Sequence, residues 1–159
     1  MPPRSYQVKR LRLGFEKGAL FYAALNLRLF ILLLINPYDY LFANDLDTLP
    51  AAYLASRLKR KPLLYDSHEL FTEVPELVSR PRIQHFWLRI EQRILPHLKV
   101  MITVNESIAA IFKSTYSIPV NVVRNVPQRQ EQLNALSREE LNLKPTQKML
   151  IIQGSGLNV

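Results

Sequence analysis

The sequence predicts an α/β fold in which a parallel sheet is flanked by helices. Short apolar runs alternate four times with longer segments of helical periodicity, and this order is typical of parallel strands joined by helical crossovers. Two polar clusters, at residues 44–47 and 66–69, each begin where an apolar run ends. Because ligands bind outside the carboxyl ends of parallel strands, both clusters are candidate binding loops.

The amino-acid composition favours an acidic partner and excludes several kinds of catalytic and metal site. The chain has 159 residues, which suits one ordinary domain with a real core. Its 21 Lys and Arg against 13 Asp and Glu give a net charge of +8, which favours an acidic partner: nucleic acid, an anionic membrane or a phosphorylated small molecule. The absence of cysteine excludes thiolate nucleophiles, disulfides and Cys-based zinc sites. The chain has three histidines, His68, His85 and His97. They are not spaced as metal ligands, so no metal site is expected.

The first element is an apolar helix over residues 19–35. It is almost long enough to span a bilayer, but Asn26 and Arg28 fall in its middle, where a charge is costly. We therefore expect either a core helix or an interfacial helix that contacts anionic lipid. Four basic residues precede it: Lys9, Arg10, Arg12 and Lys17.

A buried strand is predicted over residues 40–43, and a helix follows it. Asp47 or Thr48 is the expected cap, with Pro50 in the first helical turn. Residues 59–61 are all basic and close this helix, where cations suit the negative end of its dipole. This charge run is interpreted as a solvated terminus, and nucleic acid is not expected as a partner.

A second strand is predicted over residues 63–65, followed by a polar loop over residues 67–75 that should lie outside the core. A helix then occupies residues 82–95 between two prolines. Trp87 could stack on a sugar or a base, but its place on an apolar stripe favours the core. That stripe consists of Ile83, Phe86, Trp87, Ile90 and Ile94.

Strands over residues 100–104 and 120–123 complete the sheet. Asn105 follows the first of these and is predicted to cap the next helix, so it is either a structural cap or a strand-end functional residue. That helix should turn three apolar side chains inward: Ile108, Ile111 and Phe112.

Beyond residue 127 the composition becomes polar. Residues 128–147 are predicted to be a linker with one short helix, whose capping box is Ser137 and Glu140. A strand is expected at residues 148–153. The turn after it is a weak phosphate-binding candidate because no helix follows to complete it: Gly154, Ser155 and Gly156.

Four strings in this order resemble the amino-terminal domain of family 4 (group 1) glycosyltransferases: residues 43–50, 65–69, 103–107 and 122–127. The resemblance covers residues 19–159. It implies the GT-B architecture, in which a Rossmann-like acceptor domain faces a second domain that binds a nucleotide sugar, without a required metal or other cofactor.

The same resemblance implies a domain division and a truncated chain. Residues 1–127 are expected to be a partial amino-terminal domain, residues 128–147 a linker, and residues 148–159 the opening of the donor domain. The strand at residues 40–43 should then lie at an exposed apolar edge.

The resemblance also assigns residues to roles. His68 matches the family histidine that faces the transferred sugar and the leaving phosphate; the alternative is a structural histidine satisfied by Asp66 or Glu69. The expected substrate-binding residues are Asn44, Asp45, Asp47, Glu69, Asn105 and Asn125, with Gly154, Ser155 and Gly156 at phosphate.

The implied activity is retaining transfer from a nucleotide sugar to a saccharide or lipid-linked acceptor, in polysaccharide biosynthesis. The chain is expected to be inactive alone, cytoplasmic and peripheral at the inner face of an anionic membrane, with a separately encoded carboxy-terminal domain as a candidate partner. Two alternatives stay open: a non-catalytic acceptor-binding module, and a sugar-nucleotide epimerase of the same fold. Hydrolysis is disfavoured because Asp45 and Asp47 need not face the same space.

Overall fold

The computed structural model describes residues 8–126, 136–144 and 146–151. The chain divides into two compact units, Met1–Asn125 and Val126–Val159, and each is described by itself. Every helix and strand of the described residues lies in the first unit.

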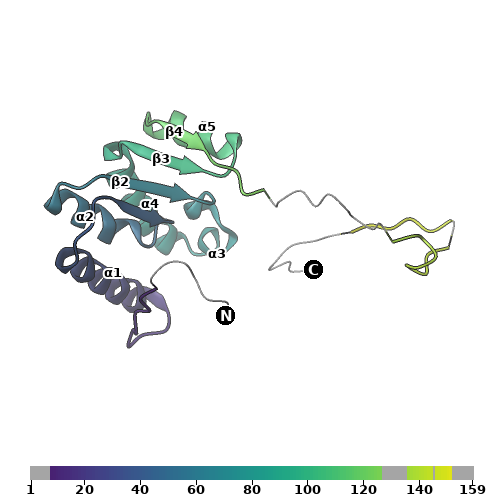
Figure 1. Cartoon of the computed structure of the whole chain (residues 1–159), viewed down its shortest axis with the longest axis horizontal. Helices are drawn as coiled ribbons and strands as arrows, with labels where there is room; N and C mark the ends of the chain where they lie inside the picture. The colour runs from purple at the N-terminus through teal and green to yellow at the C-terminus, as the bar shows by residue number, and fades with distance from the viewer. Residues whose placement is uncertain (1–7, 127–135, 145, 152–159) are drawn as a thin grey trace. The chain divides into compact units, whose positions relative to one another are not determined.

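The first unit is built on a four-stranded parallel sheet in the order β1-β2-β3-β4 (Figure 1). The predicted fold class is therefore confirmed, and each strand lies within two residues of the predicted bounds. The strands are β1 Leu41–Asn44, β2 Leu63–Ser67, β3 Val100–Thr103 and β4 Val120–Val122.

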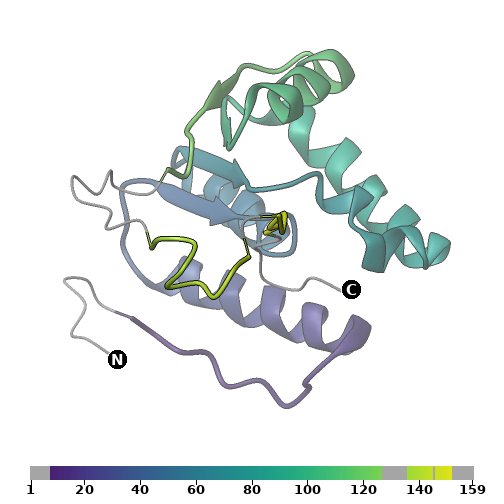
Figure 2. The same cartoon turned by 90° about the vertical axis from the view of Figure 1, so that its right-hand side faces the viewer.

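Three helices connect consecutive strands, and all three cover the same face of the sheet. Crossovers between parallel strands are right-handed, so strands added one after another in a single direction place every connecting helix on one side. Figure 2 shows this arrangement. These helices are α2 Leu49–Lys59, α4 Pro81–Ile94 and α5 Glu106–Tyr116; α1 is Gly18–Ile35, α3 is Pro75–Val78, and η1 Phe71–Glu73 and η2 Leu95–His97 are 3₁₀ turns.

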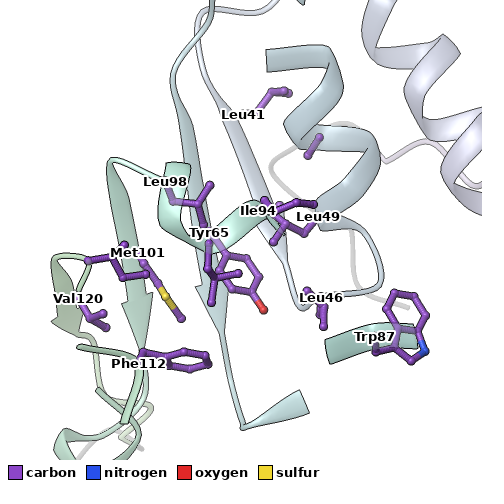
Figure 3. Packing of buried hydrophobic residues seen from close by; sticks show 14 of the residues in the cluster. Leu41, Leu46, Leu49, Tyr65, Trp87, Ile94, Leu98, Met101, Phe112 and Val120 are labelled. Carbon is purple, nitrogen blue, oxygen red and sulfur yellow. The ribbon is translucent and has the colours of Figure 1, made fainter. Parts of the chain in front are cut away.

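The core lies between this covered face and the helices. Tyr65 of β2 is only 1% exposed and Met101 of β3 is fully buried, and both point toward the helices (Figure 3). Trp87 of α4 is 3% exposed, which confirms its predicted place in the core. Other members of the cluster are Leu41, Leu46, Leu49, Ile94, Leu98, Phe112 and Val120.

The opposite side of the sheet, here called the open face, carries the alternate residues of each strand. One row across it runs Phe42, Leu64, Val100, and the next runs Asn44, Asp66, Ile102, Asn121. Phe42 is 51% exposed. In the described part of the chain β1 pairs only with β2, so the expected exposed edge at residues 40–43 is present.

Three helices are less buried than their sequences predict. None of the residues of α1 is buried, so the core-helix interpretation is wrong; α1 lies on the surface, where half-buried Tyr22, Phe30 and Leu33 pack against the core. By length and composition α1 could also cross a membrane. Ile83 and Phe86 are exposed, contrary to prediction, because α4 packs mainly against α3, η1 and α2 rather than against the strands. Ile111 of α5 is also exposed.

The segment at residues 67–75, predicted to lie outside the core, is partly buried. Ser67 belongs to β2 and is fully buried, and Thr72 is 4% exposed. Burial is possible because their polar groups are paired: the Ser67 hydroxyl donates to the Glu69 carbonyl at 2.7 Å, and the Gln84 amide donates to the Thr72 carbonyl at 2.9 Å.

In the second unit the predicted capping box forms without a regular helix. The Ser137 N–H donates to the Glu140 carboxylate at 2.7 Å and the Glu140 N–H donates to the Ser137 hydroxyl at 3.1 Å. Residues 138–142 form a turn, because Asn142 has a φ of 54° that ends helical geometry.

The strand predicted at residues 148–153 does not form over residues 148–151. No neighbouring strand pairs with it among the described residues, and a lone strand has no ladder to stabilise it. Residues 152–153, together with Gly154, Ser155 and Gly156, lie outside the described residues.

Candidate functional site

The carboxyl ends of β1 and β2 form the centre of the candidate site. Asn44 and Asp66 are paired in register, and the Asp45 N–H donates to the Asp66 carbonyl at 2.9 Å. Asp45 has a φ of 59°, in the left-handed region that Asp tolerates better than most residues. This conformation turns the chain sharply away from the sheet edge directly after β1.

His68 contacts residues at the carboxyl ends of both β1 and β2. Its ring Nε2 lies 3.2 Å from the Asp66 carboxylate, and its backbone N–H donates to the Asp45 carboxylate at 3.4 Å. The His68 side chain is 43% exposed whereas that of Asp66 is 16% exposed. Asp66 thus orients an imidazole that remains open to a ligand. Of the two structural partners expected for His68, Asp66 is the one in contact.

Asp47 sits half-buried in the loop between β1 and α2. Burial raises the pKa of its carboxyl above the ordinary value of 3.8, because the charged form loses water, and the nearby Asp45 charge acts in the same direction. Asp47 therefore takes up a proton more readily than a solvated aspartate. It can donate as well as accept hydrogen bonds when protonated.

Asn26 of α1 holds this loop, a role that sequence reasoning missed. Its amide donates to the Asp47 carbonyl at 2.8 Å, and its side-chain oxygen accepts from the Ala51 N–H at 3.1 Å. Asn26 thus satisfies a first-turn donor of α2 from another helix. The signal was an amide in the middle of an apolar helix, interpreted only as a feature that disfavours membrane insertion.

The predicted cap at Thr48 works differently from the expectation. Thr48 occupies the cap position of α2 but makes no side-chain cap bond; its hydroxyl instead donates to the Asn44 carbonyl at 2.6 Å. Asp47 does not cap the helix either. The Thr48 hydroxyl fixes the loop instead, and Asn26 accepts the hydrogen bond from the Ala51 N–H in the first turn of α2.

Asn105 and Asn125 follow β3 and β4. The Asn105 side chain accepts from the Ile108 N–H at 2.9 Å, which confirms the predicted helix cap. Asn125 is exposed three residues after β4. Their roles in substrate binding stay predictions.

Comparison with protein-family models identifies the region that carries this site. The model described as Glycosyltransferase Family 4 matches residues 2–127, which include every strand and helix described above. The chain belongs to glycosyltransferase family 4. A search of curated proteins gives no match.

For a family 4 glycosyltransferase, the strand ends offer suitable chemistry. Asp45, Asp66 and His68 are joined by direct contacts, Asp47 lies close enough for its pKa to respond to Asp45, and Glu69 is exposed beside His68. Carboxylates accept hydrogen bonds from sugar hydroxyls, and an imidazole can donate to a phosphate oxygen. Among the described residues no group of three His, Asp or Glu side chains could hold a metal ion.

Proposed function

We propose that this chain is the acceptor-binding domain of a retaining glycosyltransferase that transfers a sugar from a nucleotide sugar to a saccharide or lipid-linked acceptor, as in polysaccharide biosynthesis. Family membership supports sugar transfer in general. The observation that carries the proposal further is the position of His68, held by Asp66 and Asp45 yet 43% exposed at the strand ends.

His68 acts on the leaving group in this proposal. In the imidazolium form both ring nitrogens donate, so that Nε2 holds Asp66 while Nδ1 is available to a phosphate oxygen of the departing nucleotide. Hydrogen-bond donors aimed at charge that develops in the transition state supply a large share of enzymatic rate enhancement. The transfer proposed here uses no metal or other cofactor.

The acceptor hydroxyls bind the neighbouring carboxylates and amides. Asp45, Asp47 and Glu69 accept hydrogen bonds from hydroxyls, and Asn44, exposed at the end of β1, is assigned to the same role. Asn105 and Asn125 are assigned to the same role at β3 and β4. Gly154, Ser155 and Gly156 are assigned to phosphate, as the sequence predicts.

A cytoplasmic location at an anionic membrane surface suits this assignment. The net charge of +8 attracts acidic lipid, and α1 is apolar, surface-exposed and adjacent to the site through Asn26. A separately encoded donor domain is the proposed protein partner, because the nucleotide sugar needs phosphate and base contacts beyond these strand ends.

The test compares the purified chain with the chain assembled with a family 4 donor domain, using a panel of nucleotide sugars and acceptors. We expect no transfer above background from the chain alone, because positioning of the donor supplies a large part of the rate. We expect transfer from the assembled enzyme, with the anomeric configuration retained in the product.

Three results would revise this proposal. Robust turnover by the chain alone contradicts its inactivity in isolation. Inversion of the anomeric configuration contradicts the retaining mechanism. Acceptor binding with no transfer by any assembled form supports a non-catalytic acceptor-binding module.

A further inference from the structure

An apolar groove lies between α1, α3 and α4, beside the strand-end loops. Its volume is about 770 Å³, within the range of about 300–1,000 Å³ typical of small-molecule sites. Five aromatic side chains from three elements line it, and we call it the aromatic groove: Phe21, Tyr22, Phe71, Phe86 and Trp87.

The aromatic rings of the groove form one packed cluster around Trp87. Its ring centroid lies 5.1 Å from that of Tyr22, 5.3 Å from that of Phe71 and 5.5 Å from that of Phe86, all with edge-to-face geometry. Trp87 is buried, whereas Phe86 is 57% exposed and Ile83 is 43% exposed. The groove therefore has a packed, buried base at Trp87 and an exposed apolar rim at Phe86 and Ile83. Burial of this rim by a ligand would be favourable.

The charged residues that line the aromatic groove are more often positive than negative, and all are exposed, so we call their side of the groove its mouth. They are three cations and two carboxylates: Lys17, Arg80, Arg82, Glu16 and Glu76. Among the described residues none of these three cations forms a salt bridge. Arginine matches phosphate geometry well, so an apolar chain with an anionic head complements both the walls and the mouth.

The aromatic groove also adjoins the carboxylate loops of the proposed site. Asn26 and Pro50 line it, and Asn26 directly holds the Asp47 carbonyl. Phe71, on the groove wall, follows Glu69 by two residues. One molecule can therefore lay a polar part on the strand ends and an apolar part in the groove.

The outer surface of α1 indicates where an apolar ligand would come from. Its exposed large side chains recur 7, 11 and 15 positions after the first and share one helix face. They are Leu20, Leu27, Ile31 and Ile35, with exposures of 61%, 60%, 48% and 73%. A helix that presents such a stripe beside the groove can rest on lipid, the source of long hydrocarbon chains.

We propose that the aromatic groove binds the hydrocarbon chain of an anionic lipid-linked acceptor, a saccharide carried on a prenyl or alkyl phosphate, whose sugar hydroxyls reach Asp45, Asp47 and His68. The inference rests on the proposed function and deepens it, since it selects a lipid-linked acceptor over a free saccharide. The Arg and Lys side chains at the mouth bind the phosphate, while the aromatic walls bind the chain.

Trp87 is the single tryptophan of the chain, and its fluorescence reports the occupant directly. The probe is dodecyl phosphate brominated along its chain, titrated as monomers into the purified 159-residue chain. Bromine quenches an indole that it contacts, so we expect saturable quenching. Affinity should rise about three- to fourfold for each added methylene group, as apolar burial predicts.

Matched variants locate the binding. Phe86→Ala and Ile83→Asp should each weaken binding at least about tenfold. Both positions are exposed, and Asp in the first turn of α4 suits the helix dipole, so the fold should persist by circular dichroism. Phe42→Ala, a comparably exposed phenylalanine on the open face, should leave the affinity unchanged.

Further arms identify the ligand chemistry. Inorganic phosphate alone should not shift the fluorescence, and brominated dodecanol should bind more weakly than the phosphate. Vesicles of anionic brominated lipid can quench Trp87 either because the α1 face inserts into the bilayer or because one lipid chain enters the groove. Ile83→Asp should abolish only the quenching that comes from a chain in the groove. Absence of quenching, equal quenching in the groove variants, or quenching that accompanies dimer formation in sedimentation would overturn the proposal.

Failure of this inference is distinguishable from failure of the proposed function. Binding in the aromatic groove without sugar transfer by the assembled enzyme contradicts the proposed activity alone. Transfer to a water-soluble saccharide without binding in the groove contradicts the lipid-linked acceptor alone.

Discussion

The two faces of the sheet are built from the same four strands, yet they differ sharply in burial. On the covered face Tyr65 is 1% exposed, while Phe42 and Val100 on the open face are 51% and 43% exposed. Side chains alternate between faces along a strand, and all three crossover helices lie on one side. A shift of one residue therefore decides whether a side chain contributes to the core or remains available for contacts.

The same division continues at the strand ends. Thr103, on the covered face, donates its hydroxyl to the Ser67 carbonyl at 2.7 Å, and both residues are fully buried. Asp66, on the open face, instead directs its carboxylate to His68. We expect substitutions on the covered side to change stability, and substitutions at the open ends of the strands to change function.

The largest expected effect compares the two faces directly. Tyr65→Ala should lower the free energy of unfolding by about 3–5 kcal/mol, because it removes a fully packed aromatic ring. Phe42→Ala should lower it by less than about 1 kcal/mol, since half of that ring already contacts solvent. Urea denaturation of both variants provides the measurement. Equal losses would show that the open face is covered in solution.

A second prediction concerns a carboxyl group buried beneath the covered face. Glu91 is 5% exposed and accepts from the Tyr116 hydroxyl at 2.5 Å. Burial raises the pKa of Glu91 above its ordinary value of 4.5, although the Tyr116 bond partly opposes the shift. The folded state thus holds this proton more tightly than the unfolded chain, so stability falls as the pH rises from the unfolded value to the folded one.

Glu91→Gln should remove this pH-dependent loss of stability, because the amide oxygen still accepts from the Tyr116 hydroxyl and carries no charge. We expect its free energy of unfolding to stay flatter as the pH rises above 4.5, where a single titrating group contributes at most about 1.4 kcal/mol per pH unit. Glu76→Gln, at an exposed position of α3, serves as the control. A Glu91→Gln profile that overlays the wild-type profile would contradict the prediction.

The smallest expected effect tests a residue that lies between the two roles. Asn105→Ala removes the side-chain cap of α5 and should cost about 1 kcal/mol, whereas Asn105→Asp should retain most of that stability. Thermal unfolding of both variants measures the cap. Acceptor affinity is then measured on the same samples. If Asn105 also binds substrate, Asn105→Ala should bind the acceptor more weakly than the wild type.

The order of strands and helices could be predicted from sequence, because each strand is a compact apolar run followed by polar residues. Exposure could not. Periodicity shows that Ile83, Phe86 and Trp87 share a helix face, but not that only Trp87 of the three is buried. The buried state of Thr72 likewise depends on Gln84, twelve residues away.

The candidate site was predictable in its residues but not in its contacts. Strand-end positions identified Asp45 and His68 as candidates, since polar residues there follow apolar runs. Their contact requires β1 and β2 to pair in a specific register, which local pattern does not specify. Asn26 was missed for the same reason: its partners lie 21 and 25 residues away.

Replacement of His68 in the assembled enzyme, with kcat and Tm measured on the same preparation, tests its proposed role in catalysis. His68→Ala should lower kcat by about 10²-fold or more, as expected for loss of one donor to developing charge, with Tm unchanged. His85→Ala, an exposed histidine of α4, should change neither quantity. A near-normal kcat in His68→Ala would show that this imidazole does not act on the leaving phosphate.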